Sequence, residues 1–247
     1  MTTTFDHILL LGRPAAGKSE FIDFMKKTSD AERAERYHIG KFEELDDFVW
    51  LWDKFMEDDL WEEAGCERLF SKRYDSNYGL KPGMGKLFDL MLTRFNHEAA
   101  ARYISHPGFY RDGTVIVEFA RGGNDGYRKA LPALSKEILE RAAILYVKVS
   151  FDESWRRNVA RYEEKLAHSI LAHMVPRETM DAFYRLDDWD SYTSGRPEGV
   201  LDVKGVRVPF VTMNNEPELK ERGPLAERYG PALDKLWKLR NAIPSPL

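Results

Sequence analysis

Residues 12–19 restrict the possible folds of this chain more than any other feature. They are Gly12, Arg13, Pro14, Ala15, Ala16, Gly17, Lys18 and Ser19, and they fit the pattern G-x-x-x-x-G-K-[ST] at every fixed position. A largely apolar, β-rich segment precedes them at residues 5–11, and apolar residues at helical spacing follow in residues 18–27. Strand, glycine loop and helix in this order are typical of a phosphate-binding loop. We therefore predict that the chain binds a nucleoside triphosphate here.

Each fixed position of the loop has a physical task. Glycines let the backbone wrap closely around a phosphate, and the following helix adds the positive end of its dipole. Lys18 would reach the β and γ phosphates, and the hydroxyl of Ser19 would bind magnesium. The loop thus predicts ATP and Mg²⁺ as cofactors, with all eight of its residues at the nucleotide.

Composition narrows the class of protein. Hydrophobic residues make up 43% and charged residues 32% of the 247 residues, which is ordinary for a globular chain. A net charge of −4 argues against a general affinity for nucleic acid. The longest apolar runs have the length of strands rather than of membrane spans, and the N-terminus lacks the pattern of an export signal. With a single cysteine, these features predict a soluble, cytoplasmic protein without a membrane partner.

Strand and helix patterns alternate along the chain. We predict strands at residues 5–11, 37–40, 114–119, 142–149 and 206–213. Helices are expected at residues 18–27, 42–61, 86–104, 127–141, 152–165, 176–190 and 225–239. Such alternation favours a parallel sheet with helices on both faces. Without a convincing linker, we expect one domain over residues 1–247.

Glu118 lies at the end of the apolar strand at residues 114–119. A phosphate-binding loop needs a carboxylate at the end of a neighbouring strand, which holds magnesium directly or through water. We therefore predict that Glu118 is a catalytic residue and a magnesium ligand. The alternative is a solvated carboxylate at a strand end.

Three arginines lie on the polar helix at residues 152–165. Arg157 and Arg161 are four residues apart and share one helical face, with Arg156 beside them. Guanidinium groups that close over a phosphoryl group stabilise its negative charge and exclude water. We predict that Arg157 and Arg161 are catalytic and that Arg157 also binds the nucleotide. The alternative is a solvated helix face on which arginines pair with glutamates.

A cluster of acidic residues, Glu43, Glu44, Asp46 and Asp47, follows the second predicted strand. A carboxylate could orient an acceptor hydroxyl and take its proton, and nearby Trp52 could stack on the acceptor. We select Glu44 and Asp47 as candidate catalytic residues, although the sequence leaves open which of the four acts. Acidic residues are also favoured at a helix start by the helix dipole alone.

These parts in this order resemble the P-loop kinases of small molecules, and most closely the deoxynucleoside kinase group. The resemblance is carried by the loop at residues 12–19, by V-I-V-E-F-A-R at residues 115–121, and by R-R-N-V-A-R-Y-E-E at residues 156–164. It implies a three-layer α/β fold with five parallel strands in the order 2-3-1-4-5 and a helical lid at about residues 151–174. It also implies ATP-dependent transfer of a phosphoryl group to a nucleoside or deoxynucleoside, with Arg121 and Trp52 at the substrate.

Two features depart from that family. Phe119 and Ala120 stand between Glu118 and Arg121, whereas the deoxynucleoside kinases have an arginine directly after the strand-end glutamate. The spacing of their catalytic carboxylate to a tryptophan is matched by Asp47 and Trp52, but without their proline. A kinase of a non-nucleoside small molecule therefore stays open, as does a P-loop switch that hydrolyses its nucleotide slowly. The sequence has no NKxD-like guanine motif, which favours ATP over GTP, and a homodimer is left open.

Overall fold

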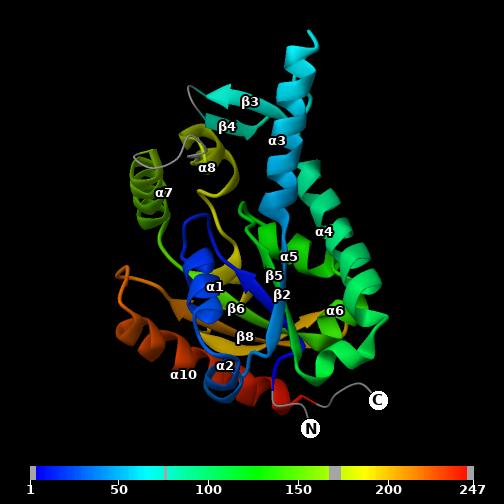
Figure 1. The fold of residues 1–247 in the computed structure, drawn as a ribbon, viewed down its shortest axis with the longest axis vertical. Helices are drawn as coiled ribbons and strands as arrows, with labels where there is room; N and C mark the ends of the chain where they lie inside the picture. Colours follow the sequence, from blue (N-terminus) through cyan, green and yellow to red (C-terminus); the bar gives the residue numbers. More distant parts are fainter. Residues whose placement is uncertain (1–3, 75–76, 167–173, 244–247) are drawn as a thin grey trace.

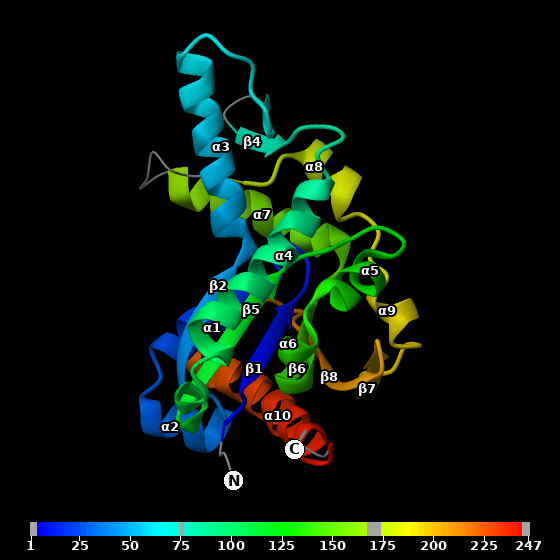
Figure 2. The same ribbon diagram turned by 90° about the vertical axis from the view of Figure 1, so that its right-hand side faces the viewer.

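A six-stranded sheet forms the centre of the computed structural model, which describes residues 4–74, 77–166 and 174–243 (Figures 1 and 2). From edge to edge its strands are β2 (Lys41–Asp46), β5 (Gly113–Phe119), β1 (His7–Leu11), β6 (Ala142–Lys148), β8 (Val206–Asn214) and β7 (Glu198–Val203). The first five are parallel. In chain order they are the second, third, first, fourth and fifth parallel strands, so the predicted order 2-3-1-4-5 is confirmed.

The sixth strand, β7, was not predicted. It pairs antiparallel with β8 through a two-residue turn at Lys204 and Gly205, both of which have positive φ angles (53° and 80°). Turns of this kind match the twist of a hairpin. The antiparallel pair extends the parallel sheet by one edge strand, and the expected count of five strands is corrected to six.

Helices cover both faces of the sheet, as the alternation predicted. One face packs against α1 (Lys18–Lys26), α2 (Asp30–Tyr37) and α10 (Arg222–Asn241). The other packs against α4 (Lys86–Ala99), α5 (Gly126–Ala133), α6 (Lys136–Arg141) and α9 (Trp189–Tyr192). Since every residue of β1 is buried, successive side chains of this central strand enter opposite core layers.

The predicted strand at residues 37–40 is wrong. Helix α2 ends at Tyr37, and the second strand is β2, which begins at Lys41. Because β2 lies at the edge of the sheet, Lys41 and Glu43 are exposed and the strand tolerates acidic residues. Its charged sequence therefore resembles the start of a helix, whereas the following helix, α3 (Asp47–Glu63), begins only at Asp47.

Two predicted helices are each divided in two. Residues 127–141 contain α5 and α6, because Leu134 is extended and the side chain of Ser135 caps the second helix. Residues 176–190 contain α8 (Arg177–Phe183) and the start of α9. The predicted helix at residues 86–104 is α4 followed by one π-helical segment, η1 (Ala100–Ile104), and the arginine-rich helix is α7 (Phe151–Leu166). A short 3₁₀ helix, η2 (Pro107–Arg111), precedes β5. Among the described residues, no helix is long and apolar enough to cross a membrane.

Helix α3 and a small hairpin, β3 (Ser71–Tyr74) with β4 (Asn77–Leu80), project beyond the body of the sheet (Figures 1 and 2). The buried carboxylate of Asp58 on α3 accepts hydrogen bonds from the backbone N–H groups of Leu69, Phe70 and Ser71 and from the Ser71 hydroxyl. Although burial raises the pKa of Asp58, the hydrogen bonds from Ser71, Leu69 and Phe70 outweigh it and lower this pKa. One ionised side chain thus fixes the hairpin to the helix.

Replacing Asp58 with Asn is expected to loosen this projection, because an amide nitrogen would face N–H donors. The free energy of unfolding should fall by about 1–3 kcal/mol at pH 7, with faster amide exchange at residues 69–71. Since the folded pKa lies below the unfolded one, the contribution of Asp58 is present at neutral pH and disappears as pH falls through the folded pKa. Asp53→Asn, at an exposed position of the same helix, is the control; equal exchange in both variants would contradict the assignment.

Candidate active site

The loop at residues 12–19 connects β1 to α1, as the motif predicted. Gly12 and Gly17 have φ angles of 143° and 105°. A Cβ atom on Gly12 would lie 2.5 Å from the Val147 carbonyl oxygen, and one on Gly17 would lie 2.2 Å from Nδ2 of Asn215. Both positions therefore require glycine. No side chain caps the start of α1, so its first N–H groups are available to an anion.

Arg13 braces the loop from outside. Its guanidinium donates to the carbonyl oxygens of Tyr184 and Val149 at 3.1 and 3.0 Å, and it lies 3.4 Å from the carboxylate of Asp187. The Tyr127 hydroxyl accepts from the N–H of Gly12 at 3.1 Å. The side chain of Arg13 holds the loop against the neighbouring segments, and its predicted contact with a nucleotide stays a prediction.

Lys18 places a buried ammonium group at the loop. Its Nζ donates to the carbonyl oxygens of Gly12 and Arg13 at 3.0 Å each and lies 3.8 Å from Oε1 of Glu118. The exposed fraction of Lys18 is only 6%, so water screens this charge weakly. Lys18 and Glu118, which the sequence assigned to one site, are brought together.

Asp46 is the last residue of β2, Glu118 is the last but one of β5, and the two are partners in the register of these adjacent strands. Burial, together with the nearby Asp46 and Asp47 charges, raises the pKa of Glu118 to about 7 against the effect of Lys18. Burial also raises the pKa of Asp46 to about 6, although the N–H of Phe48 donates to its carboxylate at 2.8 Å. Two carboxylates thus compete for one ammonium group.

Asp47 and Glu44, the two acids that the sequence selected as catalytic, have different partners. Asp47 is buried and its Oδ2 lies 2.6 Å from Nη1 of Arg121. Burial raises the pKa of Asp47 and the Arg121 charge opposes this shift. Glu44 pairs with Lys26 at 2.6 Å and is not among the described residues lining the adjoining cavity. Asp47 and Asp46 both line that cavity.

Asp46 belongs to the predicted acidic cluster but is not one of the two acids predicted to be catalytic. The position of Asp46 at the end of a parallel strand could have indicated its role, because the carboxyl ends of parallel strands meet at one edge of the sheet. The misplaced second strand hid this signal, because residues 37–40 end six residues before Asp46.

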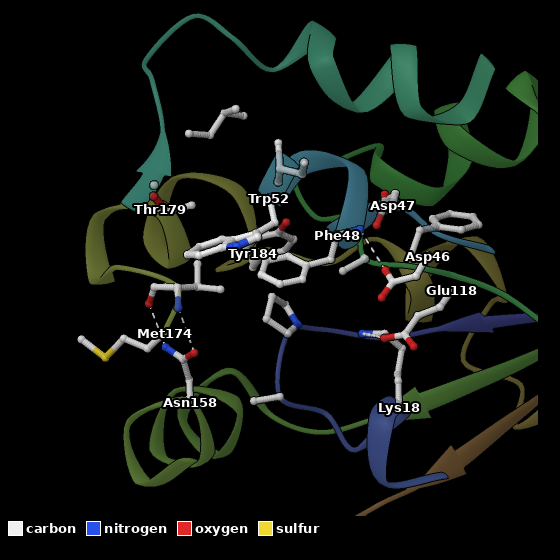
Figure 3. Close-up of a pocket in the computed structure, with 18 of the residues that line it drawn as sticks. Lys18, Asp46, Asp47, Phe48, Trp52, Glu118, Asn158, Met174, Thr179 and Tyr184 are labelled. Atoms are coloured by element: carbon white, nitrogen blue, oxygen red, sulfur yellow. Dashed lines mark hydrogen bonds and ion pairs between the residues drawn. The ribbon is translucent and has the colours of Figure 1, made fainter. Parts of the chain in front are cut away.

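Next to the loop lies a cavity of about 360 Å³, which we call the first cavity. Lys18, Asp46 and Glu118 are at one end, and the rings of Phe48, Trp52 and Tyr184 form its middle (Figure 3). Trp52, predicted at the substrate, lines this cavity, whereas Arg121 lies behind Asp47 and donates to the Phe88 carbonyl oxygen at 3.0 Å. A mostly apolar pocket with a few convergent polar groups is typical of a small-molecule site.

A second cavity of about 800 Å³ lies on the other side of the loop. Its walls include Phe24 of α1, Arg157 of α7 and Tyr229 of α10. Ala15, Ser19 and Arg161 line both cavities. The phosphate-binding loop therefore separates the first cavity from the second, and the two cavities meet at Ser19.

The arginines of α7 have unequal environments. Arg157 is 3% exposed and donates to Glu153 and to the carbonyl oxygen of Asn215, both at 2.6 Å. The Ser154 hydroxyl donates to the Pro14 carbonyl oxygen at 2.7 Å, so the start of α7 is fixed to the loop.

Arg161 is partly exposed and lies 3.5 Å from Glu20. Arg156 is on the surface, paired with Glu153 and Glu218. The predicted lid at residues 151–174 includes residues 167–173, outside the described residues, and a lid motion stays a prediction.

The donors present fit a magnesium ion bound together with phosphate. Among the described residues, no group of three acidic, histidine or cysteine side chains could hold a metal alone. Magnesium in nucleotide sites usually has few protein ligands and completes its shell with phosphate oxygens and water. Ser19 and Glu118 would supply those ligands, since both line the first cavity beside the phosphate-binding loop.

The sequence matches no protein family model and no curated protein. Similar solved structures include a gluconokinase from Sinorhizobium meliloti 1021 (14% identity, 97% of each chain covered, TM-score 0.44). They also include a sugar kinase from Janibacter sp. HTCC2649 (12% identity, 94% of this chain and 95% of that chain, TM-score 0.42). A shikimate kinase from Acinetobacter baumannii is a third (15% identity, 91% and 90%, TM-score 0.38). The closer resemblance to deoxynucleoside kinases stays a prediction.

The acidic pair should make the protein less stable as pH rises in the absence of nucleotide and magnesium. The folded-state pKa values of Glu118 and Asp46, about 7 and about 6, exceed the unfolded values of about 4. The folded state therefore holds more protons between these values, and the free energy of unfolding should fall by up to about 4 kcal/mol from pH 5 to pH 8. Glu118→Gln should remove most of this loss in denaturant titrations.

Glu227→Gln is a control for that measurement, since Glu227 is exposed on α10. The Glu227→Gln variant should keep the wild-type pH dependence of the free energy of unfolding. If the Glu118→Gln variant also keeps this pH dependence, the pKa of Glu118 is not raised in the folded protein.

Proposed function

We propose that this protein is a P-loop kinase that transfers the γ phosphoryl group of ATP to a hydroxyl group of a small molecule. A nucleoside or deoxynucleoside is the first class of acceptor to test. The observation that carries the proposal is the half-buried pair of Asp46 and Glu118 beside Lys18, at one end of an aromatic cavity that adjoins a phosphate-binding loop. Nucleotide binding alone would not require such a cavity on the acceptor side.

The two cavities suit the two substrates. The second cavity would hold the nucleoside part of ATP, with its phosphates on the loop where N–H groups and the Lys18 ammonium can meet them. Moving Lys18 from carbonyl oxygens to phosphates replaces neutral acceptors with charged ones, which strengthens its hydrogen bonds. Bound magnesium would neutralise phosphate charge, and Ser19 and Glu118 would hold it.

The acceptor would enter the first cavity with its hydroxyl toward Asp46. The hydroxyl oxygen forms a bond to the γ phosphorus, the bond from that phosphorus to the bridging oxygen breaks, and ADP leaves with the bonding electrons. Asp46 accepts the hydroxyl proton. A pKa raised to about 6 suits a base that must take a proton near neutral pH.

Arg161 is placed to act at the junction. It lines both cavities, and its only ion pair among the described residues is the 3.5 Å contact with Glu20. A guanidinium at the boundary between donor and acceptor can stabilise charge that spreads over the transferring group. The buried hydrogen bonds of Arg157 suit a role in shaping the second cavity.

The walls of the first cavity support an acceptor that contains a ring. Phe48 and Trp52 have ring centroids 6.1 Å apart, and Trp52 lies 5.9 Å from Tyr78. Aromatic side chains of this kind pack well against flat molecules. A nucleoside meets this requirement, and so would other alcohols that contain a ring. Measuring ATP consumption in the presence of nucleosides and of other ring-bearing alcohols decides between these two classes of acceptor.

Asp46→Asn should lower acceptor-dependent turnover by about 10²–10⁴-fold, because it removes the proton acceptor. The fold should persist, since asparagine caps a helix as well as aspartate does and Asp46 caps α3. Glu44→Gln is the matched control on the same strand and should keep near wild-type turnover. ADP release with and without acceptor measures both; equal losses in the two variants would rule out this role for Asp46.

Arg161→Ala should lower turnover steeply, by as much as about 10³-fold if the group contacts the transferring phosphoryl. Its stability should change by only about 0–1 kcal/mol, as for other partly exposed ion pairs. Lysine should restore little, because it lacks the planar fork of arginine. Arg156→Ala on the surface of the same helix is the control, and turnover equal to that control would place Arg161 outside the reaction.

A further inference from the structure

Arg13 joins the phosphate-binding loop to one wall of the first cavity. Its Nε donates to the carbonyl oxygen of Tyr184 at 3.1 Å, and its Nη1 donates to that of Val149 at 3.0 Å. Nη1 also lies 3.4 Å from the carboxylate of Asp187. Tyr184 and Asp187 belong to residues 184–188 between α8 and α9, which we call the connecting segment. A single side chain therefore links the loop to this segment.

Both ends of this link are fixed. Only 13% of the Arg13 side chain and 6% of the Asp187 side chain are exposed, so water screens their ion pair weakly. The Asp187 carboxylate also accepts hydrogen bonds from the Tyr146 hydroxyl and, at 2.8 Å, from the N–H of Trp189. An arginine suits this position because its planar fork bonds to several oxygens at once. A shift of the loop at Arg13 would therefore be passed to the connecting segment.

The connecting segment also packs against the loop that follows β5. A Cβ atom on Gly122 would lie 2.1 Å from the Phe183 carbonyl oxygen and 2.9 Å from Cα of Tyr184. The N–H of Gly123 donates to the carbonyl oxygen of Leu186 at 2.8 Å. The segment thus contacts the loops after both β1 and β5, and the backbone of Tyr184 is restrained by both.

Tyr184 extends this link into the first cavity. Its ring lies in the middle of that cavity, between Thr179 and the carboxylates of Asp46 and Glu118 (Figure 3). The surface that an acceptor would meet therefore includes a side chain whose backbone is held by the phosphate-binding loop. A displacement of about 1 Å in a positioning group can lower a rate about 10²-fold. The placing of Tyr184 thus matters for a reaction in this cavity.

Nucleotide binding would change the loop at the residue that makes this link. In this structure Nζ of Lys18 donates to the carbonyl oxygens of Gly12 and Arg13 at 3.0 Å each. Phosphates are stronger acceptors, and they would draw the ammonium away from these carbonyl oxygens. The Arg13 backbone thus has two arrangements, one with Lys18 on its carbonyl group and one with Lys18 on a phosphate. An element with two arrangements can couple two binding sites.

We propose that Arg13 is a positioning residue that couples nucleotide binding at the loop to the acceptor side of the first cavity. Bound nucleotide orders the loop, and Arg13 then holds the connecting segment and Tyr184 in the arrangement that receives the acceptor. The inference deepens the proposed function and rests on it for the identity of the first cavity as the acceptor site. Because coupling between sites is reciprocal, the acceptor would tighten nucleotide binding through the same side chain.

Amide exchange tests this coupling without an acceptor. The N–H groups of Tyr184 and Trp189 donate to Met180 and Asp187, so their exchange reports opening of the connecting segment. Saturating Mg²⁺ and the non-hydrolysable analogue AMP-PNP should slow this exchange about 5- to 150-fold in the wild type. Protection confined to the phosphate-binding loop, with none at the connecting segment, would overturn the inference.

The double variant Arg13→Gln/Asp187→Asn removes the link and leaves neither buried charge without its partner. At an analogue concentration that saturates this variant, exchange should slow in the loop but not in the connecting segment. Arg13→Lys keeps the charge opposite Asp187 and should recover only part of the protection, because it lacks the planar fork. Full protection of the connecting segment in these variants would mean that Arg13 only stabilises the fold, and would overturn the inference.

Arg33→Gln is the matched control for these variants. Arg33 is also buried and donates to three backbone carbonyl oxygens, those of Gly40, Met25 and Thr28. It is outside the described linings of both cavities. The control variant should lose stability and keep the wild-type protection of the connecting segment.

A second measurement separates this inference from the kinase proposal. For a nucleoside or ring-bearing alcohol that stimulates ATP consumption, AMP-PNP should tighten binding about 5- to 150-fold in the wild type. This factor should fall towards one in the double variant. If the connecting segment is protected through Arg13 but no such compound stimulates ATP consumption, the kinase proposal fails and the coupling stands. If a compound does so and the factor is equal in both proteins, the kinase proposal stands and the coupling fails.

Discussion

The parallel pairing of β5 with both β1 and β2 is the constraint on which the site depends. Parallel strands end at the same edge of a sheet, so this pairing brings the loop after β1 next to Glu118 of β5 and Asp46 of β2. Moving either neighbour away from β5 would separate Lys18 from the carboxylates. The two core layers that cover β1 on both faces hold this arrangement in place.

The same pairing creates an electrostatic imbalance. Asp47 has a partner in Arg121, but Asp46 and Glu118 share the single ammonium of Lys18, which is also bonded to two loop carbonyl oxygens. Buried like charges are costly unless a cation compensates them. The negative charge of Asp46 and Glu118 can be balanced by a bound cation or by protonation of one of the two. Magnesium bound with ATP would supply such a cation, and the phosphates would attract the Lys18 ammonium.

Helix α7 links the two cavities to the loop that separates them. Its first turns are bonded to Pro14 and, through Arg157, to Asn215, which restricts this end of the helix. Arg161, one turn further along, is less constrained and faces the junction of the cavities. Fixing the first turns while leaving the next arginine freer would let a guanidinium adjust to a bound nucleotide without disturbing the loop.

The sequence alone determined the phosphate-binding loop, four of the five parallel strands and the place of Glu118 near a strand end. These follow from local rules: glycines where the backbone must turn sharply, continuous apolar runs in doubly covered strands, and a carboxylate at a strand end. The strand order came from the resemblance to P-loop kinases, because local rules do not say which strands pair. The sequence did not determine β7 or the true second strand, because edge strands contact one neighbour and their sequences are nearly as polar as loops.

Only the tertiary structure decided which acids line the first cavity and which arginine is buried. Glu44, Asp46 and Asp47 are chemically almost equivalent in the sequence, yet Glu44 pairs with Lys26 away from the cavity. Asp46 and Asp47 both line the first cavity, and Asp47 is paired with Arg121. Arg157 and Arg161 share a helical face and differ in burial because Asn215 approaches only the first of them. Such choices depend on contacts between residues far apart in the chain, and spacing along the chain has no information about those contacts.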